Sequence, residues 1–102
     1  MKNASIYSSF KSAINVFTKS SATEFGKLGI RVNCITPGVI RTPMTSQYID
    51  DNYDKIIEPI ALGRAGSCKE VANAVLFLCS DLASYITGTV LEITGGKYMT
   101  QF

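Results

Sequence analysis

A tyrosine and a lysine stand four residues apart near the start of the chain, as Tyr7 and Lys11. Residues four apart on a helix lie one turn apart on the same face, so the phenol and the ammonium are expected to be neighbours. A free phenol has a pKa of about 10, and a nearby positive charge favours its ionised form. The pair therefore has the chemistry of a tyrosine acid/base tuned by a lysine, although an exposed helical pair without a catalytic role has the same spacing.

One long helix is expected to carry this pair, over Tyr7 to Leu28. Apolar and small residues recur there at three- and four-residue steps, which predicts an amphipathic helix. These residues are Phe10, Ala13, Ile14, Phe17, Ser21, Phe25 and Leu28. Gly26 and Gly29 are expected to end the helix, since glycine readily adopts the left-handed cap conformation. The β-branched stretch from Ile30 to Thr36 then predicts a strand, which the following Pro-Gly pair terminates.

The second half of the chain predicts another helix and another strand. A long stretch rich in proline and glycine comes first, with only a weak helical pattern around Ser46 to Ile57. Ser67 and Glu70 form an S-x-x-E capping box, which precedes a helix predicted over Lys69 to Ser80. A last strand is predicted over Thr89 to Thr94, before a pair of glycines.

This order of helices and strands indicates an α/β fold. Two strands more than fifty residues apart in sequence, with helices between them, predict a parallel sheet that has helices on its faces. A two-stranded parallel sheet is rarely stable alone, because parallel pairs occur almost only within larger, doubly covered sheets. The chain is therefore expected to be an incomplete portion of a larger, doubly wound parallel sheet.

Charge and cysteine content exclude several kinds of partner. The chain has 10 Lys and Arg against 8 Asp and Glu, a formal net charge of +2, which is far from the dense basic surface of nucleic-acid-binding proteins. There is no histidine, and the 3 cysteines lack the close spacing of metal ligands, so buried, reduced thiols and no metal site are expected. No apolar run approaches the roughly twenty residues that span a bilayer, so no membrane span is expected.

Four ordered motifs cover most of the chain from the tyrosine onward. They read Y-S-S-F-K-S-A over residues 7–13, E-F-G-K-L-G-I-R-V-N-C-I-T-P-G-V-I-R-T-P-M over 24–44, L-G-R-A-G-S-C-K-E-V-A-N-A-V-L-F-L-C-S-D over 62–81 and Y-I-T-G-T-V-L-E-I-T-G-G over 85–96. In order and spacing these motifs resemble the short-chain dehydrogenase/reductase family. Within the family, the stretch P-G-V-I-R-T and the ending E-I-T-G-G-K-Y-M are most similar to 17-beta-hydroxysteroid dehydrogenase type 8. Bacterial 3-oxoacyl-(acyl-carrier-protein) reductases are nearly as similar.

The resemblance implies an oxidoreductase site that uses NAD(H) or NADP(H). Tyr7 would exchange a proton with the carbonyl or alcohol oxygen, and Lys11 would bind the nicotinamide ribose, while the cofactor supplies the hydride chemistry. Tyr7 and Lys11 would thus also be cofactor-binding, together with the segment that ends the first strand: Pro37, Gly38, Val39, Ile40 and Thr42. A substrate lid over residues 43–64 would include Met44, Tyr48 and Ile60, although ordinary lid packing explains these three equally well.

The resemblance also implies partners and a compartment. The substrate would be a 3-oxoacyl thioester or a hydroxysteroid-like molecule. The helix over residues 69–80 and the strand over 89–94 would lie at the interfaces of a homo- or hetero-tetramer, in the mitochondrial matrix or the cytoplasm. Three glycines, Gly88, Gly95 and Gly96, are expected to serve turns and close packing between subunits, and the polar strand residues Arg31 and Asn33 are given no functional role.

Four features of the family are missing from these 102 residues. They are the glycine-rich turn that binds the pyrophosphate at a helix N-terminus, the acidic or basic residue that selects NAD or NADP, an N-A-G segment, and a catalytic serine about a dozen residues before the tyrosine. Residues 1–102 are therefore expected to be the carboxy-terminal part of a single NAD(P)-binding domain, and a very poor enzyme by themselves. The alternative is a genuine short, non-catalytic protein that pairs with a full-length family member.

Overall fold

A computed structural model describes residues 4–97 of the chain. The elements, in chain order, are α1 (Ala4–Gly26), β1 (Cys34–Pro37), β2 (Ile40–Arg41), α2 (Ser46–Asp51), α3 (Tyr53–Ile57), β3 (Gly66–Ser67), α4 (Cys68–Cys79), the 3-10 helix η1 (Asp81–Ala83) and β4 (Val90–Ile93). The predicted α/β class is confirmed, as are both long helices.

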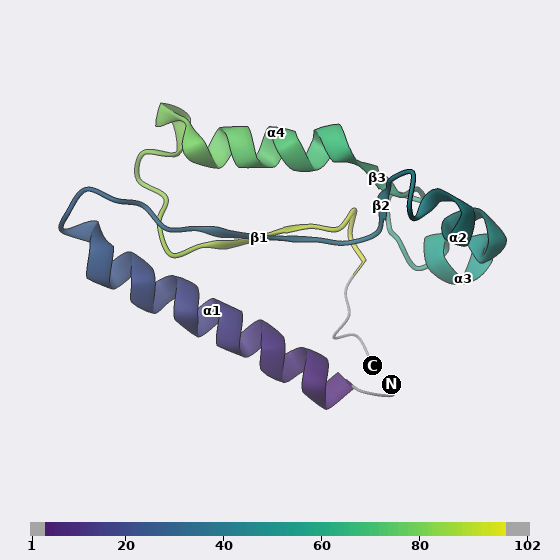
Figure 1. Cartoon of the computed structure of the whole chain (residues 1–102), viewed down its shortest axis with the longest axis horizontal. Helices are drawn as coiled ribbons and strands as arrows, with labels where there is room; N and C mark the ends of the chain where they lie inside the picture. Colours follow the sequence, from purple (N-terminus) through teal and green to yellow (C-terminus); the bar gives the residue numbers. More distant parts are fainter. Residues whose placement is uncertain (1–3, 98–102) are drawn as a thin grey trace.

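The centre of the structure is a parallel pair of strands between two helices. Strands β1 and β4 pair in parallel, with Cys34 opposite Val90 and Pro37 opposite Ile93. Helix α1 lies along one face of the pair and α4 along the other, while α2 and α3 gather at one end (Figure 1). The predicted parallel pairing of two distant strands is therefore confirmed. A second parallel pair, β2 with β3, was not predicted, because each of these strands is only two residues long.

The first strand begins later than predicted, at Cys34 rather than Ile30. Before Cys34, the side chains of Arg31 and Asn33 hydrogen-bond to the loop that precedes β4. Arg31 Nη1 donates a hydrogen bond to the Ile86 carbonyl (3.2 Å), and Asn33 Nδ2 donates to the same oxygen (3.0 Å). The Thr89 backbone N–H donates to Asn33 Oδ1 at 3.0 Å. These residues therefore fix the loop before β4, a structural role that satisfies backbone groups of the loop.

Helix α1 leaves much of its apolar face uncovered. It spans Ala4–Gly26, so it begins earlier and ends earlier than predicted. Only Thr18 and Ala22 are buried, whereas Phe10, Phe17 and Leu28 of the predicted apolar stripe are exposed. A two-stranded sheet is too narrow to cover a 23-residue helix, which is why an amphipathic pattern does not lead to burial here.

A hydrogen-bonded cap begins α4, as the sequence predicts. The Glu70 backbone N–H donates to Ser67 Oγ at 3.2 Å, and the Ser67 N–H donates to Glu70 Oε1 at 3.0 Å. Arg64 adds two further hydrogen bonds to the same carboxylate, both of 2.8 Å. These hydrogen bonds, that of Arg64 above all, lower the pKa of Glu70 to about 2. The capping box thus also ties the end of the lid segment to α4.

The lid segment has a small apolar core of its own. The predicted weak helix is resolved into α2 and α3, which are separated by Asn52. The core consists of Ile49, Ile57 and Ile60, with Val39, Ile56 and Ala65 packed against it. The glycine turn after β4 packs on this segment, because a Cβ at Gly96 would lie 2.6 Å from the Ala61 Cβ. Gly95 and Gly96 both have positive φ, which confirms their predicted part in a turn; the close packing observed here is within the chain, against Ala61.

Within residues 4–97, no helix combines the length and the apolar character that crossing a membrane requires.

Replacing Glu70 by Gln should weaken the acid sensitivity of folding. A carboxyl whose folded pKa is about 2 stabilises the fold fully above its unfolded value of about 4.3, and this contribution is lost as the pH falls toward 2. The melting temperature of E70Q should therefore fall less between pH 5 and pH 2.5 than that of the parent protein, as measured by circular dichroism. Glu24→Gln, an exposed change on α1, should leave the parent's dependence intact; equal slopes for E70Q and the parent would contradict the prediction.

Candidate active site

Tyr7 and Lys11 lie in the amino-terminal part of α1, as the sequence predicts. This end of the helix lies on the same side of the molecule as the carboxyl ends of β1 and β4 (Figure 1). The Lys11 ammonium is 5.8 Å from the centre of the Tyr7 ring, which is within the range of a cation–π contact. Tyr7 is 37% exposed, so its phenol is accessible to a ligand. The predicted juxtaposition of phenol and ammonium is therefore present.

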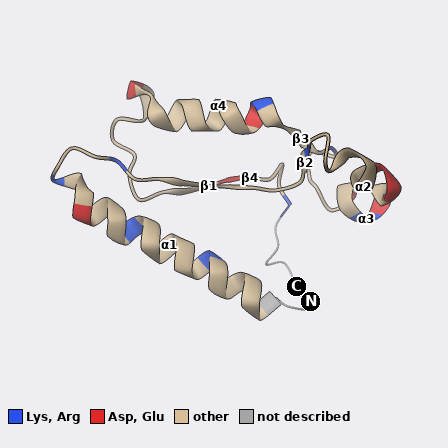
Figure 2. Ribbon diagram, in the orientation of Figure 1, with Lys and Arg blue, Asp and Glu red and all other residues tan. Residues whose placement is uncertain are grey.

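The ammonium has a second partner, which the sequence analysis missed. Lys11 Nζ donates a hydrogen bond of 2.5 Å to Oε1 of Glu92, a residue of β4. This hydrogen bond is the main cause of a raised pKa of Lys11. Figure 2 shows an acidic position on β4 in red and basic positions on the neighbouring helix α1 in blue. The only sequence signal was an acidic residue at one position of an otherwise apolar strand.

A cavity of about 230 Å³ opens beside the pair. It collects Tyr7 and Lys11 from α1, Pro37, Gly38 and Val39 from the end of β1, and Thr36, Thr94 and Lys97. Five residues predicted for catalysis or cofactor binding are thus brought together. Loops at the carboxyl ends of parallel strands are the usual ligand sites of open α/β sheets.

Thr36, which lines this cavity, has a polar atom without a partner. The Thr36 hydroxyl is buried and, within residues 4–97, accepts and donates no hydrogen bond, whereas a buried hydroxyl normally has a partner. Gly38 packs tightly against the end of β4, because a Cβ there would lie 3.0 Å from the Thr94 Cα. The accessible polar groups that the cavity presents to a ligand are the Tyr7 phenol and the ammonium groups of Lys11 and Lys97.

A larger, apolar cavity of about 690 Å³ adjoins the first. The two share Pro37, Gly38, Val39 and Lys97 as lining residues. The larger one also contains the predicted residues Ile40, Thr42 and Tyr48. Five further lining residues were not predicted: Thr45, Ile49, Ile56, Cys68 and Val71. Its mostly apolar lining suits a hydrocarbon part of a ligand.

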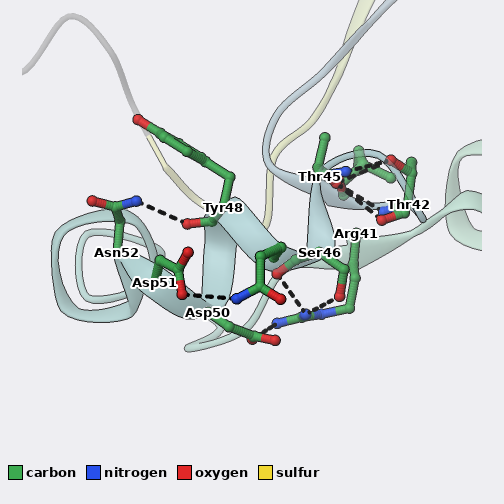
Figure 3. A network of polar contacts seen from close by, with 10 residues as sticks. Arg41, Thr42, Thr45, Ser46, Tyr48, Asp50, Asp51 and Asn52 are labelled. Carbon is green, nitrogen blue, oxygen red and sulfur yellow. Dashed lines mark hydrogen bonds and ion pairs between the residues drawn. The ribbon is translucent and has the colours of Figure 1, made fainter.

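A network of polar contacts shapes the mouth of the larger cavity (Figure 3). The Thr42 N–H donates to Thr45 Oγ1 at 2.8 Å, and the Thr45 N–H donates to Thr42 Oγ1 at 3.1 Å. Arg41 pairs with Asp50 at 3.1 Å and donates to Ser46 Oγ at 2.7 Å. These contacts fix α2 against β2, and the Tyr48 ring projects away from the Arg41 pair (Figure 3).

The three predicted lid residues have different positions. Tyr48 lines the larger cavity. Ile60 is 4% exposed and belongs to the apolar core of the lid, so it lies in neither cavity described above. Met44 is 91% exposed and lines neither cavity. Only Tyr48 is therefore placed where it can contact a ligand in this conformation.

The described part of the chain has no cluster of side chains that could bind a metal ion. No group of three or more Cys, Asp or Glu residues within it could hold a metal ion. Cys34, Cys68 and Cys79 are free thiols, but Cys68 and Cys79 are exposed, so the predicted burial of the thiols is wrong for these two. The polar groups at the site are instead a phenol, two ammonium groups, a carboxylate and hydroxyls.

The chain matches a known protein family and several known proteins. The family described as "Enoyl-(Acyl carrier protein) reductase" matches residues 1–97. The 3-oxoacyl-(acyl-carrier-protein) reductase FabG of Aquifex aeolicus is 49% identical over 92 residues, which are 90% of this chain and 37% of that protein. The chain thus spans little more than a third of the curated relative's length.

Solved structures show the same fold. A 3-oxoacyl-(acyl-carrier protein) reductase from Brucella melitensis superposes with a TM-score of 0.83 at 38% identity, covering 92% of this chain and 35% of that one. A 4-hydroxyisoleucine dehydrogenase complexed with NADH gives a TM-score of 0.79 at 38% identity, with 89% and 38% coverage. The fold is that of a Rossmann-like oxidoreductase domain, in part. The chain belongs to the short-chain dehydrogenase/reductase family.

Thr36→Val should stabilise the fold. Valine has nearly the same shape and removes a buried hydroxyl that has no partner among the described residues, a group whose burial costs about 1 kcal/mol or more. The free energy of unfolding without ligands, from urea titration, should rise by about 1 kcal/mol. Thr23→Val is the control on the exposed surface of α1. A loss of stability in T36V would mean that the hydroxyl has a partner.

Proposed function

We propose that these residues belong to an NAD(P)-dependent oxidoreductase that interconverts a carbonyl group and a secondary alcohol. The observation that carries the proposal is the position of the Lys11 ammonium, 5.8 Å from the Tyr7 ring, at a cavity beside the carboxyl ends of parallel strands. A phenol beside a fixed cation is suited to proton transfer near neutral pH.

Tyr7 is the proton donor and acceptor in this proposal. During reduction its hydroxyl gives a proton to the substrate oxygen as the carbonyl carbon is reduced, and the phenolate that remains is stabilised by the Lys11 ammonium. During oxidation the phenolate takes the proton of the alcohol. Lys11 also orients the cofactor through its remaining N–H groups, because an ammonium has three donors.

The cofactor is NAD(H) or NADP(H), which supplies or accepts the hydride when bound. The residues present fit such a group: Lys11 and Lys97 offer ammonium donors at the cavity, and Thr36, which also lines it, has a hydroxyl without a partner among the described residues. Val39, Ile40 and Thr42 would extend this contact toward the larger cavity. The NADH complex of the related 4-hydroxyisoleucine dehydrogenase supports this assignment.

The substrate is a 3-oxoacyl thioester of the kind carried by acyl carrier protein. The apolar cavity of about 690 Å³ next to the Tyr7 cavity provides space for an acyl chain, with Tyr48 at its edge. The 49% identity to the Aquifex aeolicus reductase supports this choice. Turnover of acetoacetyl thioesters, compared with turnover of hydroxysteroids, distinguishes the thioester from a steroid substrate.

The 102 residues are the carboxy-terminal part of a larger NAD(P)-binding domain in this proposal. Two observations support it: the chain matches 37% of the length of its Aquifex aeolicus relative, and apolar residues on α1 and α4, among them Phe10, Phe17 and Leu76, are exposed. Assembly into a tetramer through the segments 69–80 and 89–94 belongs to the same proposal.

The exposed apolar faces also support a second candidate, a non-catalytic subunit that pairs with a complete family member. Such faces are typical of surfaces that bind another protein. The two candidates differ in one measurable property. An oxidoreductase binds NADH or NADPH and oxidises it with a 3-oxoacyl thioester, whereas a pairing subunit does neither when purified without its partner.

Tyr7→Phe in the gene product that contains these residues should reduce kcat by about 10²–10⁴-fold, because general acid–base catalysis by one side chain contributes that much. The measurement is NADH or NADPH oxidation with acetoacetyl thioester. Tyr85→Phe, at a fully exposed tyrosine, is the matched control and should keep full activity. Activity of Y7F within a factor of two of the parent would refute the role of Tyr7.

Lys11→Met should weaken dinucleotide binding by about tenfold or more, because hydrogen bonds to a charged group contribute about 1.5–3 kcal/mol. Methionine retains most of the apolar length of the side chain and removes the ammonium. Dissociation constants for NADH and NADPH, from fluorescence titration, provide the test. Lys27→Met, an exposed change near the end of α1, controls for the lost charge, and equal affinities of K11M and the parent would contradict the assignment.

A further inference from the structure

The carboxylate of Glu92 contacts Lys11 from a distant part of the chain. The two residues are 81 positions apart and their charged atoms are 2.5 Å apart. Glu92 is the register partner of Thr36 in the paired strands, and Thr36 lines the cavity that also contains Tyr7 and Lys11. The carboxylate is therefore next to the candidate site, on the face of the sheet that α1 covers.

The pair contributes little to stability, because both side chains are accessible to water. Their exposed fractions are 30% for Lys11 and 40% for Glu92, and solvent-exposed ion pairs have small net energies. The contact instead determines the position of the Lys11 ammonium and the electrostatic potential that it produces at the Tyr7 phenol. A cation beside a carboxylate is partly neutralised, so it favours phenolate less strongly than a free cation at the same position.

Few other charged groups face this pair. Lys97, which follows β4, lines the same cavity as Tyr7 and Lys11. Arg64 and Glu70 border a neighbouring cavity of about 190 Å³ together with Glu92, but they are paired with each other at 2.8 Å. Glu92 is thus the carboxylate within the described residues that is hydrogen-bonded to the ammonium of the site.

We propose that Glu92 is a positioning residue of the active site, which holds the Lys11 ammonium at the sheet edge and moderates its effect on Tyr7. The inference rests on the proposed function. One N–H of Lys11 donates to Glu92, and the other two remain for the cofactor ribose. The raised pKa of Lys11, caused mainly by the hydrogen bond to Glu92, supports the same view, since it keeps the ammonium charged at all working pH values.

Glu92→Gln tests the contact without any need for activity. Glutamine has the same shape and lacks the charge, so the pKa of Lys11 should fall from its raised value in E92Q. NMR titration of ¹³C-labelled lysines, with the Lys11 signal assigned from K11M, provides the measurement. Glu24→Gln removes the same charge from α1 about thirteen residues along the helix, roughly 20 Å from Lys11, and should leave the Lys11 titration unchanged. A Lys11 titration equal in E92Q and the parent would overturn the contact.

The pH profile of alcohol oxidation tests the effect on Tyr7. Without the Glu92 carboxylate, the Lys11 ammonium favours the Tyr7 phenolate more strongly. The kcat/KM for alcohol oxidation rises with pH as this phenolate forms, and in E92Q the rise should occur at lower pH, by about half a pH unit or more. Glu92→Asp retains the charge, so kcat/KM should rise at nearly the same pH in this variant as in the parent protein. A role of Glu92 in folding alone would not predict this difference between E92Q and E92D.

The outcomes separate the two proposals. A parent protein that oxidises a secondary alcohol with NAD(P), together with an unshifted rise of kcat/KM in E92Q, would refute the role of Glu92 and leave the proposed function standing. A parent protein that binds neither NADH nor NADPH would refute the proposed function and the positioning role together. The Lys11 titration would still report in that case whether the ion pair exists.

Discussion

The site depends on the parallel register of β1 and β4. Because Cys34 lies opposite Val90 and Pro37 opposite Ile93, both strands end at the same edge, and the chain leaves each of them beside the amino-terminal part of α1 (Figure 1). Parallel strands have to be connected through a crossover, so this edge can collect residues from distant parts of the sequence. A shift of β4 by one residue against β1 would turn Glu92 away from α1 and break its contact with Lys11.

The two cavities at this edge differ in the polarity of their linings. The smaller one contains the phenol, the ammonium groups and an unpartnered hydroxyl, whereas the larger one is mostly apolar. Their arrangement follows from the lid, whose small core around Ile49 is separate from the sheet. Thr42 and Thr45 hold the first turn of this lid by mutual hydrogen bonds. A polar cavity thus adjoins space for an apolar chain, and no charged side chain among residues 4–97 is buried.

Local signals in the sequence predicted much of this structure. Helical periodicity, the capping box of Ser67 and Glu70, and the spacing of Tyr7 and Lys11 each act within a few residues, so a single sequence contains them. The contact between Lys11 and Glu92 spans 81 positions and could not be predicted without the register of the sheet. The late start of β1 depends on side-chain hydrogen bonds of Arg31 and Asn33 to the loop before β4. The exposure of Phe17 depends on the width of the sheet, which periodicity does not report.

The two cavities share part of their lining. Gly95 and Gly96 reverse the chain against Ala61, and Lys97, which follows them, borders both cavities, as do Pro37, Gly38 and Val39. A segment that lines two cavities at once connects them mechanically, because displacing it from one cavity changes the shape of the other.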